Sequence, residues 1–189
     1  MRLHLGIHKK IRCIYAYLNL LRFRVKKSFL GFDVANLFTQ RVDKRSLVLI
    51  LKKNGAKIGK NCDIETGIVF HNCKDYSNLC IGDNSHIGKN CFFDLRDKID
   101  IGNNVTISMQ CSFTTHQDMG KSFLDEIYGK TQKPIIITDN VYIGINSTIL
   151  QGVIIGKKSI IAAGSVVKDN VLTKIIAGGV PAKLIKKLN

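Results

Sequence analysis

One of the five histidines of this chain stands where an imidazole could act as a general base. His116 opens a long polar stretch that begins Thr115-His116-Gln117-Asp118. A neutral imidazole takes up a proton near pH 7, so a loop histidine beside a rigid scaffold suits acid–base chemistry. A solvated loop histidine would have the same sequence context, and that alternative stays open here. The other histidines are His4, His8, His71 and His86. We expect His4 and His8 to lie at the surface.

Aliphatic residues recur every six positions through most of the chain, and this step predicts the scaffold beneath His116. Gly often follows the aliphatic residue, and a small or β-branched residue stands four positions after it. The longest unbroken run is Ile137, Ile143, Ile149, Ile155, Ile161 and Val167. Three short strands of this period close a coil of about eighteen residues, and such coils stack by strand pairing. The sequence therefore predicts an all-β solenoid.

The interruptions of the repeat divide the chain. The repeat begins near Ile58, is lost at residues 71–80, and breaks again at residues 115–134. A stacked coil does not need a long polar insertion, so residues 115–134 are a candidate functional loop. We expect a helical segment over residues 1–53 and a solenoid domain over 54–189. We also expect Pro181–Leu188 to form a short C-terminal helix that caps the open end.

The N-terminal segment carries most of the positive charge. Residues 1–53 hold thirteen Lys and Arg against two acids, and apolar residues have helical spacing over residues 7–30. We expect a basic amphipathic helix that is interrupted near Gly31, followed by a short helix over Ala35–Leu51. This segment either packs on the solenoid or a neighbouring subunit, or rests through residues 1–30 on an anionic membrane. A nucleic-acid partner is not expected, because no recognisable binding module accompanies the charge.

The six cysteines do not indicate a metal site or a disulfide framework. Cys62, Cys91 and Cys111 occupy the small-residue position of the repeat, and the chain has no CxxC pair. Free thiols in a reducing cytoplasm are therefore expected, with no metal. The sequence has no apolar run long enough to span a membrane and no pattern typical of a secretory signal, so a cytoplasmic location is expected.

The C-terminal half resembles a known family. The stretches that carry the resemblance are Ile143-Gly144, Ile149-Leu150-Gln151-Gly152-Val153-Ile154-Ile155-Gly156, Ala162-Ala163-Gly164-Ser165-Val166-Val167 and Ala177-Gly178-Gly179-Val180-Pro181-Ala182-Lys183. They are similar to the hexapeptide-repeat acyltransferases, and within these to the maltose, galactoside and xenobiotic acetyltransferases and the capsule or O-antigen O-acetyltransferases. The resemblance covers residues 58–187.

The resemblance implies a left-handed parallel β-helix of about five coils and a homotrimer with active sites between neighbouring prisms. It implies acetyl-CoA as the acyl donor, a carbohydrate acceptor, His116 as general base, and a backbone N–H near Gly144 that stabilises the oxyanion. Asn90 and Asp118 are candidate acceptor-binding residues. The residues implied in donor binding are Gly144, Ala162, Ala163, Gly164, Lys168 and Lys183.

One departure limits what can be carried over about the acceptor. The sugar acetyltransferases have Asn-x-Asn in an early coil, where this chain has Gly88-Lys89-Asn90. The favoured function is O-acetylation of a sugar hydroxyl of a surface polysaccharide or its precursor. The alternatives are an N-acyltransferase of an amino-sugar nucleotide, a serine-type acetyltransferase, a zinc carbonic anhydrase-like protein using His71, His86 and His116, and a non-catalytic solenoid.

Overall fold

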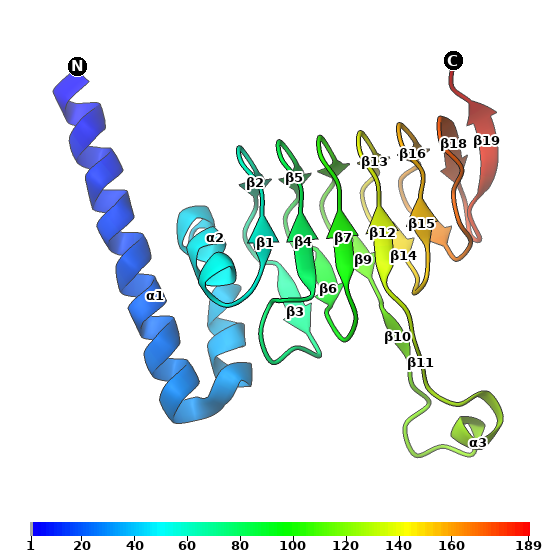
Figure 1. Ribbon diagram of the computed structural model, residues 1–189, viewed down its shortest axis with the longest axis horizontal. Coiled ribbons are helices and arrows are strands. Elements are labelled where there is room, and N and C mark those ends of the chain that lie inside the picture. Colours follow the sequence, from blue (N-terminus) through cyan, green and yellow to red (C-terminus); the bar gives the residue numbers. More distant parts are fainter. Residues whose placement is uncertain (1) are drawn as a thin grey trace.

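Two helices stand at one end of a stack of short strands, and the chain then climbs the stack to its other end (Figure 1). The computed structural model describes the backbone of residues 2–189 and the side chains of residues 8 and 10–189. The helices are α1 (Arg2–Thr39) and α2 (Lys44–Lys53). The expected surface position of the His4 side chain lies outside the described side chains.

Three parallel sheets form the faces of the stack, because each coil contributes one strand to each face. Sheet A holds β1 (Lys57–Ile58), β4 (Leu79–Ile81), β7 (Ile99–Ile101), β12 (Ile135–Ile137) and β15 (Ile154–Ile155). Sheet B holds β2 (Asp63–Ile64), β5 (His86–Ile87), β8 (Thr106–Ile107), β13 (Tyr142–Ile143), β16 (Ile160–Ile161), β18 (Ile175–Gly178) and β19 (Lys183–Lys187). Sheet C holds β3 (Val69–His71), β6 (Phe92–Asp94), β9 (Ser112–Phe113), β14 (Thr148–Ile149) and β17 (Val166–Val167).

The parallel solenoid predicted from the six-residue step is confirmed. Residues 57–167 form five complete coils, and Val171, which bridges to Ile155 of sheet A, and β18 begin a sixth. In the unbroken part, Ile137 pairs with Ile155, eighteen positions further on. The aliphatic residues of the step fill the interior, and the rings of Phe93 and Phe113 stack in successive coils with centroids 4.8 Å apart.

The Gly that follows the aliphatic residue is required by the close approach of successive coils. A Cβ on Gly82 would lie 2.5 Å from the carbonyl carbon of Gly102, which is closer than real side chains come. The left-handed backbone at the corners is adopted instead by the residue just before the small position, such as Asn84 (φ 57°) and Asn90 (φ 57°). Asn tolerates this conformation better than most residues with a side chain.

The helical segment differs from the expected pair of helices in where the second one begins. Gly31 interrupts α1 (φ 85°, ψ 168°), as predicted, but the helix resumes and runs to Thr39. α2 starts only after Asp43, whose carboxylate accepts hydrogen bonds from the backbone N–H groups of Arg45 (3.1 Å) and Ser46 (3.3 Å). This N-cap fixes the start of α2 and rules out one helix over Ala35–Leu51.

The predicted C-terminal helix is wrong. Residues Lys183–Lys187 form β19, which pairs antiparallel with β18, so that Gly178 faces Lys183 and Ile175 faces Lys187. β18 is the last parallel strand of sheet B, and its free edge offers unpaired backbone groups. A returning strand satisfies these groups, which a helix laid across the end would not do.

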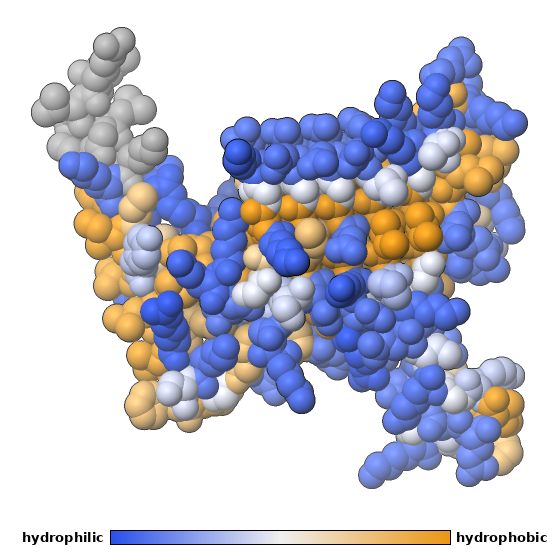
Figure 2. Space-filling model, in the orientation of Figure 1, coloured by the Kyte–Doolittle hydropathy of each residue, from blue (hydrophilic) through white to orange (hydrophobic). Residues whose placement is uncertain are grey.

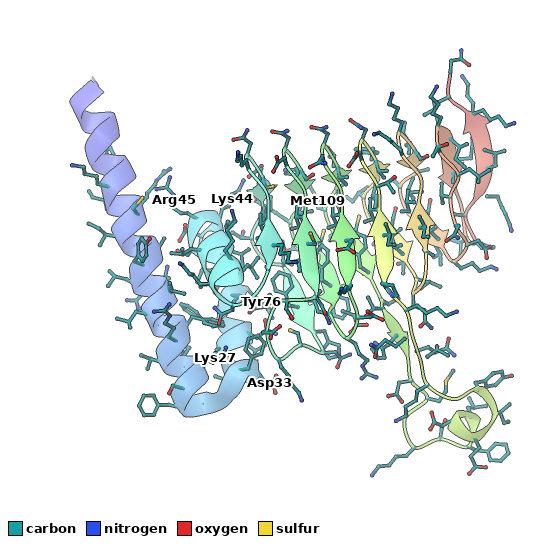
Figure 3. All side chains as sticks on the ribbon, viewed as in Figure 1. Lys27, Asp33, Lys44, Arg45, Tyr76 and Met109 are labelled. Atoms are coloured by element: carbon teal, nitrogen blue, oxygen red, sulfur yellow. The ribbon has the colours of Figure 1, made fainter. Side chains whose placement is uncertain are left out.

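The end of α1 is fixed against the first coil. Tyr76 lies where the helices meet the stack (Figure 3), and its buried hydroxyl donates to Oδ1 of Asn36 at 3.0 Å. The amide of Asn36 donates in turn to the carbonyl oxygen of Phe70 on β3 at 2.7 Å. The part of α1 beyond Gly31 is thereby held beside the corner between sheets C and A.

Candidate active site

His116 lies at the corner where sheet C passes to sheet A, on the short strand β10 (His116–Gln117). β10 pairs antiparallel with β11 (Thr131–Gln132), and these strands form the base of an arm that carries α3 (Leu124–Tyr128). The arm contains the candidate functional loop and extends away from the stack (Figure 1). His116 is therefore at the base of the arm, against the coils, and not at its tip.

Asp94, which sequence reasoning missed, is the immediate partner of His116. Nδ1 of His116 lies 2.5 Å from Oδ2 of Asp94, the last residue of β6. The side chain of Asp94 is 1% exposed and that of His116 is 20% exposed. In the pairing of β6 with β9, Phe93 faces Phe113, so the residues that follow each of them reach the same corner.

The carboxylate of Asp94 has other donors besides His116. The backbone N–H and the hydroxyl of buried Thr115 lie 2.9 Å from Oδ2, and the amide of Asn72 donates to Oδ1 at 3.0 Å. Burial by itself would raise the pKa of Asp94, but the hydrogen bonds from His116, Asn72 and Thr115 outweigh it and lower the pKa. Asp94 is thus a buried and ionised carboxylate.

This geometry sets the tautomer of His116. An ionised carboxylate can only accept, so Nδ1 of His116 carries a hydrogen, and in the neutral ring the lone pair is on Nε2. Such an imidazole can remove a proton from a hydroxyl, and the adjacent carboxylate stabilises the imidazolium that forms. The pair is suited to general-base chemistry at the corner between sheets C and A.

A cavity of about 620 Å³ lies at the same corner, between the end of α1 and the first coil. Asn72 belongs to the wall of this cavity and also donates to Asp94. Most of the lining residues have polar side chains, while Leu37, Val69 and Phe70 form an apolar part of the wall. Besides Asn72, the polar residues are Asp33, Asn36, Gln40, His71, Cys73, Lys74 and Arg96. Burial, with a further contribution from Asp33, raises the pKa of Cys73 to about 12, so this thiol stays protonated and is a weak nucleophile.

Asp118, predicted to bind the acceptor, has partners within the chain. Its Oδ1 accepts from the N–H of Gly120 at 2.7 Å, and its Oδ2 lies 3.1 Å from Nη1 of Arg96 and 3.5 Å from Nζ of Lys130. The hydrogen bond from Gly120, followed by that from Arg96, lowers the pKa of Asp118. These contacts tie the arm to the cavity wall, because Arg96 also lines the cavity.

The residues implied in donor binding gather mainly at another edge, where sheet B passes to sheet C. Gly144 and Ala162–Gly164 follow β13 and β16 at this edge. The N–H of Gly144 donates to the carbonyl of Ile161 at 2.8 Å, so it serves the coil ladder and not an oxyanion. A Cβ on Gly144 would lie 2.5 Å from the backbone nitrogen of Ala163, which explains the glycine by packing.

The remaining predicted residues divide between the two edges. Lys183 faces Gly178, and a Cβ on Gly178 would lie 2.7 Å from that of Ala162, so Lys183 is close to the donor residues. Asn90 is exposed at the same edge, two coils before the coil that contains Gly144. Lys168 follows β17 instead, at the corner of His116, and pairs with Asp169 at 3.1 Å.

The predicted base and most predicted donor contacts are therefore apart in one copy of the chain. The strands of sheet C run from the edge of Gly144 and Ala163 to the edge of His116. What the structure does bring together is His116, Asp94, Asn72 and the cavity. Among the side chains that the structure describes, no group of three or more His, Cys, Asp or Glu could jointly hold a metal ion.

Known proteins share both this sequence pattern and this fold. A family model described as the hexapeptide repeat of succinyl-transferase matches residues 79–109 and 134–168. The galactoside O-acetyltransferase of Escherichia coli (strain K12) is 30% identical over 178 residues, which are 88% of this chain and 79% of that protein. The coils and the matched repeats define a hexapeptide-repeat β-helix protein.

Two solved structures agree with this assignment. A hexapeptide-repeat acetyltransferase from Vibrio cholerae superposes with a TM-score of 0.72 at 27% identity, covering 90% of this chain and 93% of that one. A galactoside acetyltransferase in complex with coenzyme A gives a TM-score of 0.64 at 25% identity, with 90% and 82% covered. This chain belongs to the hexapeptide-repeat acetyltransferase family. Family membership favours acetyl transfer over the carbonic anhydrase-like and non-catalytic alternatives.

Proposed function

We propose that this protein transfers an acetyl group from acetyl-CoA to a sugar hydroxyl, with His116 as the general base. The observation that carries the proposal is the contact of His116 with buried, ionised Asp94, which also accepts a hydrogen bond from Asn72 on the wall of the cavity. The family supports the reaction class, and the name of the E. coli relative supports a galactoside-like acceptor. The acceptor is proposed to belong to a surface polysaccharide or its precursor, at the cytoplasmic side of the membrane.

The reaction proceeds by direct transfer. Nε2 of His116 takes the proton of the acceptor hydroxyl as the oxygen attacks the thioester carbonyl carbon. The C–O bond forms, the C–S bond breaks, and the imidazolium returns the proton to the CoA sulfur. Asp94 positions His116 and stabilises the imidazolium through Nδ1. Cys73, protonated at neutral pH, is unsuited to carry an acyl group in a covalent intermediate.

The donor is proposed to lie between two copies of the chain. His116 and the donor residues are at opposite ends of the sheet C strands, so a neighbouring copy must supply the edge with Gly144 and Ala163. A homotrimer does this three times by rotation. Because the N–H of Gly144 already donates to the carbonyl of Ile161, we assign the role of oxyanion donor to the next backbone N–H, that of Ile145. Lys183, and Lys168 from the other edge, are assigned to the phosphates of CoA.

The cavity beside Asn72 is the proposed acceptor site. Its carboxylate, amides and cations, among them Asp33, Asn36 and Arg96, can exchange hydrogen bonds with several sugar hydroxyls. The cavity shares Asn72 with the Asp94–His116 pair, so an acceptor bound there is proposed to present its hydroxyl to His116. Asn90, on the other edge, would then serve an acceptor bound against a neighbouring copy, and Asp118 would act by fixing the arm.

The test is acetylation by purified full-length protein of a panel of galactosides, other sugars and an amino-sugar nucleotide, with acetylated product measured by mass spectrometry. His116→Ala should lower kcat by about 10²–10⁴-fold, the usual contribution of a general base. His86→Ala is the matched control, because His86 also contacts an aspartate but lies on sheet B.

Activity of His116→Ala within a few-fold of the wild type would overturn the base assignment. Acetylation of the amino-sugar nucleotide on nitrogen, with no O-acetylated product from any sugar, would replace the proposed reaction with the N-acyltransferase alternative.

A further inference from the structure

The face of α1 that points away from α2 is apolar and exposed. Leu21 is 57% exposed and Phe29 is 83% exposed. The residues of this outer face recur at helical spacing and lie on one side of the helix: Ile11, Ile14, Leu18, Leu21, Val25 and Phe29. Figure 2 shows hydrophobic colour along the outer edge that α1 forms. The opposite side is already used, since Ala16, Leu20 and Phe23 are buried.

α1 is the outermost layer at the N-terminal end of the stack and lies across that end (Figure 1). A buried hydrogen bond from Asn19 to Ser46 of α2 (3.0 Å) holds it in this orientation. In the trimer proposed above, on which this step rests, copies stand side by side with their coils level. Their outer faces would then all point the same way along the axis, so the copies could not cover one another's outer faces.

Basic residues flank the outer face. Lys10, Arg22 and Arg24 lie within the same four turns of α1, whose one acidic residue is Asp33. Nucleic acid would match the charge but would leave six apolar side chains without a partner. The surface of an anionic bilayer offers both negative headgroups and acyl chains. No helix within residues 2–189 is long and apolar enough to cross a bilayer.

We propose that α1 binds the surface of a bilayer containing anionic phospholipids, with its outer face buried at the boundary of headgroups and acyl chains. The axis of the stack then stands away from the membrane, and the three copies bind through three parallel faces. The cavity beside the end of α1 lies close to this surface. A sugar carried on a lipid would therefore meet the proposed acceptor site without leaving the membrane.

The test is co-sedimentation of the full-length protein with vesicles, which requires no catalytic turnover. We expect binding to vesicles of equal parts phosphatidylglycerol and phosphatidylcholine, and much weaker binding to phosphatidylcholine alone. Leu21→Glu should weaken binding by at least about tenfold, because an apolar contact is lost and a negative charge is added. Arg24→Gln should weaken it by about fivefold.

Leu172→Glu and Lys187→Gln are the matched controls, because both residues are exposed at the other end of the stack. Circular dichroism melting of each variant confirms that it is folded. The proposal fails if the wild type binds neither vesicle, or if folded Leu21→Glu binds as the wild type does. It also fails if Leu21→Glu lowers the mass of the assembly in analytical ultracentrifugation while vesicles have no effect, since a second copy would then cover the face. Acetyl transfer to a soluble sugar, measured separately, tells a failure of this proposal from a failure of the proposed function.

Discussion

Two histidine–aspartate pairs among the side chains that the structure describes, His116–Asp94 and His86–Asp63, differ in their surroundings. In both, Nδ1 of the histidine faces Oδ2 of the aspartate, at 2.5 Å for His116–Asp94 and 3.0 Å for His86–Asp63. Asp94 is 1% exposed, whereas the side chain of Asp63 is 53% exposed. Oδ1 of Asp63 also lies 3.0 Å from Nζ of Lys44. The hydrogen bond from Lys44 makes the largest contribution to lowering the pKa of Asp63.

The difference shows what converts a common ion pair into a candidate catalytic pair. A solvent-exposed carboxylate is screened and free to change partners, so it contributes little to the orientation of its histidine. Asp94 is fixed by Thr115 and Asn72 in a place that excludes water, and its charge acts on His116 at low dielectric. The fixed carboxylate, more than the histidine itself, distinguishes the His116–Asp94 pair from the His86–Asp63 pair.

The strongest way to sharpen this comparison is to neutralise each carboxylate. Asp94→Asn should lower kcat by about 10²–10⁴-fold, because the amide can present its NH₂ to Nδ1 and favour the wrong tautomer of His116. Asp63→Asn should leave kcat within about twofold of the wild type. Steady-state kinetics across pH measures both effects, and the acidic limb of the rate profile should move only in Asp94→Asn.

A purely structural role of Asp94 would give a different result. In that case Asp94→Asn would lose thermal stability while kcat of the folded fraction and the pH profile stayed unchanged. Equal losses of kcat in Asp94→Asn and Asp63→Asn would remove the distinction between the two pairs.

A smaller effect is expected from the donor that supports Asp94. Asn72→Ala removes the amide that donates to Oδ1 of Asp94 and should cost about 1–3 kcal/mol of unfolding free energy, with kcat reduced about tenfold. Asn61→Ala is the matched control, because both residues have left-handed backbone (φ 52° and 54°) and Asn61 donates only to exposed Asn84. Urea unfolding and kinetics of both variants measure the difference.

The same strain on the alanine backbone is present in both variants, so the strain does not contribute to the difference between them. Equal stability and equal kcat in the two variants would show that the bond from Asn72 does not hold the carboxylate.

The sequence predicts the regular part of the fold well, because one physical pattern fixes it. Aliphatic residues every six positions must face one interior, so Ile137 to Val167 could be placed in coils without a structure. Cys91 and Cys111 are buried at the positions of small residues, as the step requires. The C-terminal strand β19 was missed because pairing with the free edge of β18 depends on tertiary context, not on local spacing.

The candidate site was predicted only in part, because its groups come from different coils. His116 was found from its place at the start of the arm. Asp94 could have been predicted from the repeat, because the register that aligns Cys91 with Cys111 puts Asp94 beside Thr114 at the same corner. The cavity could not be found in this way, because Asn36 and Gln40 reach it only through the break at Gly31, whose direction is set by packing.

The central claim is that one copy supplies His116 and its neighbour supplies the donor edge. Two variants test this: His116→Ala lacks the base, and Ala163→Trp places a bulky side chain at the exposed donor edge. Each should be inactive alone. Co-expression with two different tags and purification through both gives mixed trimers.

In every mixed trimer, one of the three interfaces joins an intact base to an intact donor edge. The account predicts recovery of about a third of wild-type kcat per trimer in the doubly purified material. Mixed trimers as inactive as the two parent variants would contradict it, because base and donor edge would then have to come from the same copy.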